Sequence, residues 1–144
     1  MHRAQRPIFA LLAAALLFAC AAASAPAVDL FTSGQGYKYY RIPSLLQLSD
    51  GRIMCFAEGR NVAADVGWID IVYRTSLDSS GTTWGPMRVL HSESTNTSHV
   101  SINNPAPVLD KARGSMGAGV VILFARNVKQ IVMLRSHDPF GQDW

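Results

Sequence analysis

The 144-residue sequence predicts an all-β fold built from a repeated unit of short strands. Three observations support this prediction. Short apolar or alternating runs, separated by Gly, Asp and Pro turns, fill the chain after the first 28 residues; no run there has the spacing of an amphipathic helix; and one nine-residue frame occurs twice. Runs of this length bounded by turn residues are typical of strands.

The first unit is predicted to hold four strands in a meander. They are expected at residues 42–48, 52–58, 68–76 and 86–90. The first two flank Asp50 and Gly51, and Asp-Gly between two apolar runs is a strong hairpin signal. The third run alternates, so Ile71 and Asp70 are expected on opposite faces of the sheet.

A second unit follows, with strands expected at residues 105–110, 120–126 and 130–136. In both units the third strand leads into the frame S-x-D-x-x-G-x-x-W. Its aspartate can accept hydrogen bonds from turn amides, its glycine can adopt a positive φ, and its tryptophan can pack between strands. The residues that define the two frames are Ser76, Asp78, Gly81, Trp84, Ser136, Asp138, Gly141 and Trp144.

Four-stranded units repeated in sequence, each with a motif at one corner, indicate a β-propeller. The two frames lie sixty residues apart, and the second unit stops before a fourth strand. Propellers typically have four to eight blades, and two blades would leave open sheet edges. We therefore expect residues 28–144 to be the N-terminal part, about the first two blades, of a six-bladed propeller of roughly 360 residues.

Residues 1–27 have the pattern of a secretory signal peptide. Arg3 and Arg6 precede an apolar run at 8–18, and small residues follow it. This order of basic, apolar and small residues is typical of secretory leaders. We expect cleavage between Ala23 and Ala27, and a mature chain that is secreted or lies in the lumen of the secretory pathway, with the lysosome and the cell surface also open.

Two alternatives to a cleaved leader remain. The apolar region continues to Val28, so an uncleaved membrane anchor would just span a bilayer. Cys20 lies in a loose match to a bacterial lipoprotein box, so a lipid anchor at this cysteine is the second alternative.

Composition limits the partners of the chain. The net charge is +3 and no basic run occurs, so nucleic acid is not an expected partner. After the leader Cys55 is the only cysteine, which excludes an internal disulfide and favours an inert, buried thiol. The four histidines show no metal-ligand spacing, and no phosphate loop or Ser-His-Asp order stands out, so no metal or cofactor is implied.

The chain resembles the exo-α-sialidases (neuraminidases) of glycoside hydrolase family 33 over nearly all of residues 36–144. Both frames resemble the Asp boxes of that family, S-x-D-x-G-x-T-W, with one extra residue before the glycine. More specific are Tyr-Arg-Ile-Pro at 40–43, which is similar to the family's F/Y-R-I-P, and Ala-Glu-Gly-Arg at 57–60. The resemblance implies a sialidase-type propeller and a sialylated glycoconjugate as substrate.

The resemblance also implies which arginines bind the substrate. A sialic acid carries a carboxylate on its anomeric carbon, and the planar fork of arginine suits a carboxylate best. By this resemblance Arg41 belongs to the arginine triad that grips the carboxylate, and Arg60 lies near the O4 side of the sugar. Glu58 lies on the same face of the strand as Arg60 and either orients it or forms a purely structural ion pair with it. For Arg41, a surface arginine in a loop is the alternative.

Cleavage of a glycosidic bond needs an acid that protonates the leaving oxygen. The resemblance implies that this acid is Asp65, in the loop five residues after Arg60. Asp70 is the rival, although its place in an alternating strand favours a buried, hydrogen-bonded structural carboxylate. As an acid, Asp65 would need a pKa raised toward the working pH by partial burial.

Asn104 precedes Pro105, where several sialidases have an aspartate near the substrate. An asparagine can still hydrogen-bond a sugar hydroxyl or N-acyl group, so Asn104 is a candidate binding residue, and capping of the strand is the alternative. Sialidases use a tyrosine nucleophile. That tyrosine, its glutamate partner and two further arginines are expected beyond residue 144.

The sequence thus predicts hydrolysis of terminal α-linked sialic acids with retention of configuration, and transfer to another sugar remains open. A non-catalytic Asp-box propeller that binds glycans or proteins is the competing class. Arg41, Arg60 and Asp65 together favour the enzyme, because a binding module needs no acid. The 144-residue chain by itself is expected to be inactive.

Overall fold

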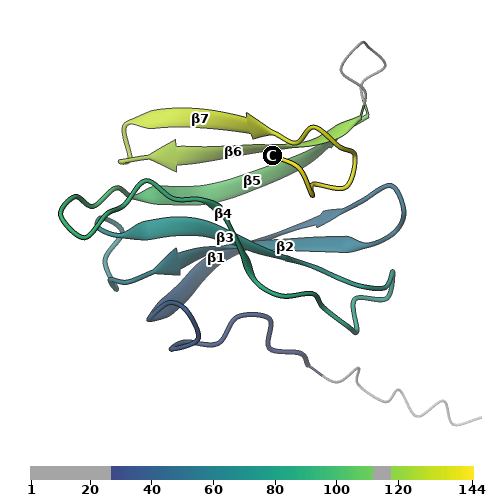
Figure 1. Ribbon diagram of the computed structural model, residues 1–144, viewed down its shortest axis with the longest axis horizontal. Helices are drawn as coiled ribbons and strands as arrows, with labels where there is room; N and C mark the ends of the chain where they lie inside the picture. The colour runs from purple at the N-terminus through teal and green to yellow at the C-terminus, as the bar shows by residue number, and fades with distance from the viewer. Residues whose placement is uncertain (1–26, 112–117) are drawn as a thin grey trace, which may run out of the picture.

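The computed structural model describes residues 27–111 and 118–144, which form two antiparallel β-sheets (Figure 1). The predicted leader, including Cys20, lies outside the described residues apart from its last position. The described part of the chain contains no helix that is long and apolar enough to cross a membrane. The strands are β1 (Tyr39–Gln47), β2 (Ile53–Arg60), β3 (Ile69–Thr75), β4 (Arg88–His91), β5 (Ile102–Asp110), β6 (Gly119–Arg126) and β7 (Gln130–Arg135).

The all-β prediction is confirmed, and so is the meander of the first unit. The first sheet has the order β1-β2-β3-β4 and the second has the order β5-β6-β7, with every pairing antiparallel. The predicted strand bounds agree to within three residues. The largest differences are at β1 and β5, which begin at Tyr39 and Ile102, each three residues before the predicted start; in both strands the proline lies inside the strand, within an irregular stretch of the pairing.

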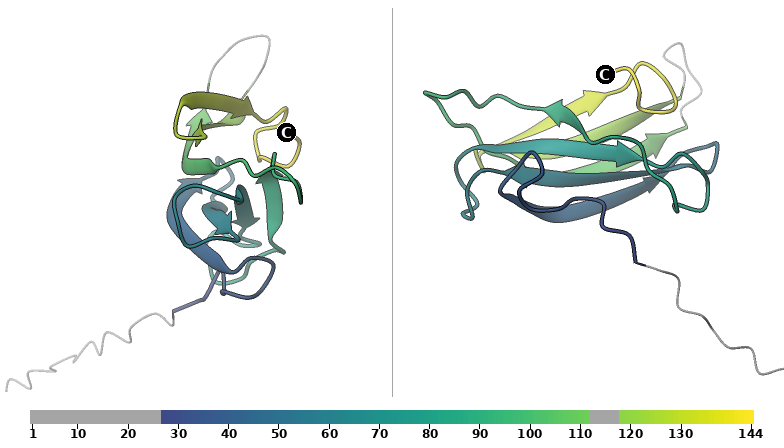
Figure 2. Two further views of the ribbon diagram at one scale, coloured as in Figure 1. Left: turned by 90° about the vertical axis from the view of Figure 1, so that its left-hand side faces the viewer. Right: turned by 60° about the horizontal axis from the view of Figure 1, so that its bottom comes forward.

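The core lies between the two sheets, where the second sheet covers one face of the first (Figures 1 and 2). Each strand alternates, so only every second side chain enters this layer. Burial of one large apolar side chain contributes about 1.5–3 kcal/mol, and this layer holds most of the buried ones. Its fully or nearly fully buried members are Leu48, Met54, Phe56, Ile71, Tyr73, Ile102, Val120, Ile122 and Phe124.

Cys55 and Asp70 face away from that layer. The Cys55 thiol is free and buried, as predicted, and burial raises its pKa to about 11. Thiolate is the reactive form of cysteine, so the raised pKa makes this thiol unreactive at neutral pH.

The first nine-residue turn forms the hydrogen bonds that its sequence predicts. Ser76 Oγ accepts a bond of 2.7 Å from the backbone amide of Ile53 and donates one of 2.7 Å to the carbonyl of Asp78. The Asp78 carboxylate in turn accepts from the backbone amides of Thr82 and Thr83, at 3.1 and 2.9 Å. The turn is therefore fixed to the start of β2 as well as closed on itself.

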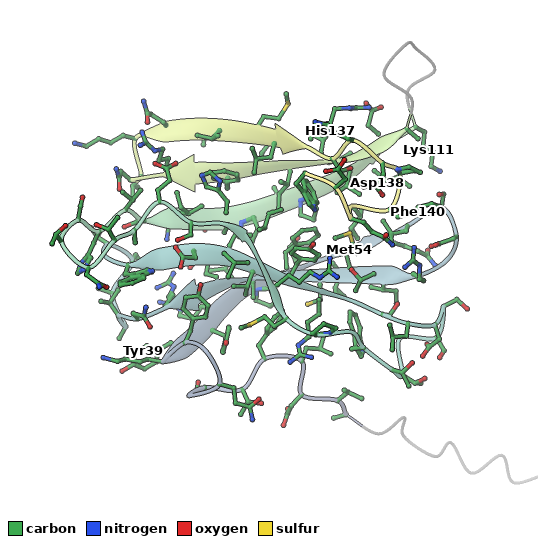
Figure 3. The ribbon with its side chains drawn as sticks, in the orientation of Figure 1. Tyr39, Met54, Lys111, His137, Asp138 and Phe140 are labelled. Carbon is green, nitrogen blue, oxygen red and sulfur yellow. The ribbon has the colours of Figure 1, made fainter. Side chains whose placement is uncertain are left out.

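The second turn repeats this arrangement at the end of β7 (Figure 3). Ser136 Oγ accepts from the backbone amide of Val120 at 2.8 Å and donates to the carbonyl of Asp138 at 2.6 Å. The Asp138 carboxylate accepts from the backbone amides of Phe140, Gln142 and Asp143.

The glycine and tryptophan of each turn also behave alike. Gly81 and Gly141 have φ values of 69° and 63°, a region that favours glycine. The indole nitrogens of Trp84 and Trp144 each donate a bond of 2.8 Å to the carbonyl of the glycine three residues earlier. The ring of Trp144 also meets the ring of Tyr73 edge-on, so the second turn packs against the first sheet.

The first strand of each sheet, β1 and β5, contains a bulge beside a proline. In β1 the pairing shifts between Arg41 and Ser44, and Ile42, just before Pro43, has a φ of 54°. A residue before proline normally stays extended, and a positive φ is a rare conformation for a β-branched residue. Such strain costs of the order of 1–3 kcal/mol and is characteristic of functional sites.

The same irregularity recurs in β5. The pairing shifts between Asn103 and Ala106, and Asn104, just before Pro105, has a φ of 57°. Bulges re-aim the side chains beside them. The two bulges thereby direct residues of both sheets into one pocket.

Candidate functional site

One pocket is lined by residues at the bulges of β1 and β5 and by Asp65 from the loop that follows β2. It brings together the four predicted site residues outside the turns, which come from three separate segments of the chain. Its lining residues are Arg41, Ile42, Arg60, Asp65, Asn103, Asn104 and Val128.

A buried ion pair forms the base of the site. The side chains of Glu58 and Arg60 are 0% and 1% exposed, and Arg60 Nε donates a bond of 2.6 Å to Glu58 Oε2. The other oxygen of Glu58 accepts from the backbone amide of Asn104 at 2.7 Å. Arg60 Nη1 donates to the carbonyl of Ala64 at 3.0 Å and to Asp65 Oδ1 at 2.8 Å.

The ion pair between Glu58 and Arg60 is structural and also orients the arginine. A buried ion pair is tolerated only where hydrogen bonds satisfy both partners, and here both oxygens of Glu58 are engaged. The same bonds tie β2 to β5 and hold the Arg60 guanidinium against the loop that carries Asp65.

Asn104 takes part through its backbone rather than as a strand cap. It lies inside β5, not at its start, and its amide is the group that contacts Glu58. Its side chain is exposed at the pocket, where it remains a candidate for binding a ligand.

Asp65 lies between the two arginines. Its Oδ1 is 2.8 Å from Arg60 Nη1 and 3.2 Å from Arg41 Nη1. The hydrogen bond and positive charge of Arg60, followed by the charge of Arg41, hold the pKa of Asp65 below its ordinary value. Arg41 therefore lies in a strand and forms an ion pair, rather than lying in a loop.

The partial burial that Asp65 would need as an acid is absent from this state of the site. The side chain is 73% exposed, so desolvation contributes little, and the two guanidiniums favour the ionised form. With Glu58, Asp65, Arg41 and Arg60 all charged, this part of the site is electrically balanced.

Asp70 lies outside the pocket. Its side chain is buried and Oδ2 accepts bonds from the Tyr37 hydroxyl at 2.7 Å and from the indole nitrogen of Trp68 at 2.9 Å. Burial, together with this contact to Asp70, raises the pKa of Tyr37. Asp70 thus has the buried, hydrogen-bonded setting that its alternating strand predicts.

Asn103 is a pocket residue that the sequence analysis did not identify. It is 4% exposed, and its Oδ1 has no hydrogen-bond partner among the described residues. The signal was available in the sequence, since residues 103–105 repeat the place of 41–43 ahead of a proline, with Asn103 where the first unit has Arg41.

No protein-family model matches the chain. It is 35% identical over 94 residues to an exo-alpha-sialidase of Arthroderma benhamiae, a match that covers 61% of this chain and 22% of that protein. It is 33% identical over 88 residues to an exo-alpha-sialidase of Aspergillus fumigatus, covering 57% of this chain and 21% of that protein.

A bacterial relative extends the comparison. The chain is 31% identical over 90 residues to a sialidase of Micromonospora viridifaciens, a match that covers 61% of this chain and 14% of that protein. The matches span about a fifth of the two fungal relatives. Over this stretch, the chain is partially homologous to the exo-alpha-sialidases.

Proposed function

We propose that the chain forms part of a retaining exo-α-sialidase, which hydrolyses terminal α-linked sialic acids of glycoconjugates. The placement of Asp65 between Arg41 and Arg60 carries this proposal, because an acid beside carboxylate-binding cations is what this cleavage requires. Partial homology to exo-alpha-sialidases supports it.

In this proposal Arg41 binds the carboxylate of the sugar. Its side chain is half exposed at the pocket, and among the described residues its one ion-pair partner is Asp65, so a ligand carboxylate can reach the guanidinium. Arg60 is fixed by Glu58 and by the carbonyl of Ala64, so it stays in place when the ligand enters.

Charge balance explains how Asp65 serves as the acid despite its low pKa in the empty site. The four charged side chains sum to zero, so a bound carboxylate makes this group of charges negative. A nearby like charge, and an Arg41 engaged by the ligand instead of Asp65, both favour the protonated form of Asp65. Substrate binding thereby raises the pKa of the acid that the reaction then uses.

The rest of the mechanism follows from the resemblance. Asp65 protonates the leaving oxygen, a tyrosine forms the covalent intermediate, and water attacks that intermediate with Asp65 as base. No described tyrosine lines the pocket, and we assign the nucleophile to none of them.

The fold and the location of the protein belong to the same proposal. The two sheets, each closed by a nine-residue turn and each opening on one pocket, correspond to two blades of a propeller. The leader pattern at residues 1–27 supports entry into the secretory pathway.

A non-catalytic binding propeller is the second candidate, and the lowered pKa of Asp65 favours it. A carboxylate that stays ionised can stabilise the arginines without donating a proton. Turnover separates the two candidates.

The test uses the full-length product of the gene and sialyl-lactose as substrate. Wild type is compared with Asp65→Asn and Arg41→Ala, and with Arg88→Ala as a control, since Arg88 is an exposed arginine outside the pocket. We expect wild type and Arg88→Ala to release sialic acid equally, and both pocket variants to lose at least about 100-fold in kcat/KM. A folded wild type that binds a sialoside column without turnover would establish the binding module instead.

A further inference from the structure

Asn103 holds a buried acceptor that the described residues of the chain leave unused. Its side chain is almost fully buried, yet its Oδ1 has no partner among the described residues. Leaving such an atom unpaired is unfavourable, so a native protein that keeps one requires an explanation. Replacement by an apolar residue would remove the unfavourable group, which makes the asparagine costly unless a ligand uses it.

The orientation of the amide follows from its one contact. Asn103 Nδ2 lies 3.5 Å from the backbone carbonyl of Asp65. The reversed amide would place two acceptor oxygens against each other, so the nitrogen belongs on the Asp65 side. The oxygen is therefore the atom without a partner, on a residue that lines the pocket.

The repeat places Asn103 and Arg41 in equivalent positions. Each stands immediately before a residue with positive φ that precedes a proline, at the edge of a bulge in the first strand of its sheet. Each also contacts Asp65, Arg41 through the carboxylate and Asn103 through the carbonyl. The same bulge geometry thus brings a cation from one sheet and a neutral side-chain amide from the other against a single residue.

A neutral oxygen acceptor selects for a donor. It is repelled by a carboxylate and pairs with a hydroxyl or an amide N–H. We propose that Asn103 determines specificity by accepting a hydrogen bond from a hydroxyl or amide N–H of the sugar acid whose carboxylate pairs with Arg41. This inference rests on the proposed function for the identity of the sugar.

The first test replaces Asn103 in the full-length protein. Asn103→Leu keeps the side-chain size and removes the acceptor, and Gln47→Leu is the matched control, since Gln47 is exposed and outside the pocket. We expect Asn103→Leu to melt at or above the wild-type temperature, while its KM for a fluorogenic α-sialoside rises about tenfold or more. A merely structural asparagine would instead lower the melting temperature and leave KM unchanged.

The second test identifies the donor with substrate analogues. Each analogue of the α-sialoside lacks one hydroxyl or has the amide N–H replaced by oxygen. We expect one analogue to have a kcat/KM about tenfold or more below that of the parent sialoside with wild type and with Gln47→Leu. With Asn103→Leu, the same analogue and the parent should differ little. Equal losses in all three proteins for every analogue would overturn the inference while leaving the proposed hydrolysis intact.

Calorimetric binding of free sialic acid and its analogues makes the outcome independent of turnover. One outcome is that a single analogue binds more weakly than sialic acid to wild type but not to Asn103→Leu, while wild type shows no turnover. That outcome would support the role of Asn103 and overturn the proposed hydrolysis. Failure of wild type to bind sialic acid at all would overturn both.

Discussion

The two sheets share their turns but differ in their pocket corners. At one end, each closes with the same serine, aspartate, glycine and tryptophan contacts, down to a tryptophan bond of 2.8 Å in both. At the other end each has the same bulge beside a proline, yet the residue ahead of the bulge is Arg41 in the first sheet and Asn103 in the second. The turn repeats both geometry and residues, whereas the bulge repeats geometry alone.

This difference separates stability from function. The turn residues satisfy backbone groups, and any sheet of this shape has the same groups to satisfy. The bulge provides a conformation and a direction, and the side chain placed there is free to change with the ligand group it meets. The strained φ values of Ile42 and Asn104 are thus shared although the chemistry is not.

The second strands differ in the same way. In the strand register of the first sheet, Arg41 lies opposite Glu58. In the register of the second sheet, Asn103 lies opposite Ala125. The first sheet thus provides the charges of the site, and the second provides a neutral acceptor and the backbone amide of Asn104 that holds Glu58.

The largest effect is expected from breaking the buried charge pair. Glu58→Gln removes the buried counter-charge of Arg60 and leaves only the exposed Asp65, so we expect the full-length protein to lose about 3–5 kcal/mol of unfolding free energy. At the equivalent place in the second sheet, Ala125→Ser should change stability by less than about 1 kcal/mol. Denaturant unfolding measures both, and similar losses at the two positions would refute the asymmetry between the sheets.

Substitution of the turn serines should have smaller and matching effects. Ser76→Ala and Ser136→Ala each remove the acceptor of one backbone amide, that of Ile53 or Val120. We expect each to cost about 1–3 kcal/mol, by the same unfolding measurement. If one substitution were neutral and the other severe, the two turns would not be energetic equivalents.

The pH dependence should reveal the coupling between ligand and acid. In the free site Arg60 and Arg41 lower the pKa of Asp65, and in the proposed reaction this acid must be protonated. As pH rises, kcat/KM should therefore begin to decline at a low pH, because it reports the pKa of Asp65 in the free enzyme. The decline of kcat should begin at a higher pH, because the bound carboxylate raises the pKa of Asp65 in the complex. A separation of about one pH unit corresponds to about 1.4 kcal/mol of coupling. Coincident limbs would mean that the ligand does not shift Asp65.

The outer faces of the sheets give the smallest expected effect. Phe31 and Tyr37 cover part of the outer face of the first sheet, whereas Leu123, Ile131 and Met133 are exposed on that of the second. An exposed apolar face promotes association. Light scattering of residues 28–144 should therefore show oligomers, and Ile131→Lys should reduce them; a wild-type piece that stays monomeric at high concentration would contradict this.

Sequence patterns predicted the strands and turns because their signals are local. Alternation in 69–75, the Asp-Gly pair at 50–51 and the repeated frame each depend on residues within one turn or strand. The bulge at Ile42 was beyond such reasoning, because a residue before proline is expected to be extended. Its conformation is imposed by tertiary structure.

The site was predictable only in part. The resemblance identified Arg41, Arg60, Asp65 and Asn104, and the structure brings them together around one pocket. It did not predict that Asp65 would be exposed and ion-paired, since both arginines reach it only when β1 and the loop after β2 meet. The place of Asn103 was readable from the repeat of 41–43 at 103–105, but its burial and its unpaired oxygen depend on contacts between the two sheets.

The central claim is that Asp65 protonates the leaving group of a sialoside bound by Arg41. The most direct test compares two substrates of wild type and Asp65→Asn in the full-length protein, sialyl-lactose with its poor leaving group and an aryl sialoside with a good one. A leaving group that departs without a proton does not need the acid, so we predict a loss of at least about 100-fold on sialyl-lactose and a much smaller loss on the aryl sialoside. Equal losses on both substrates would show that Asp65 acts in binding rather than as the acid.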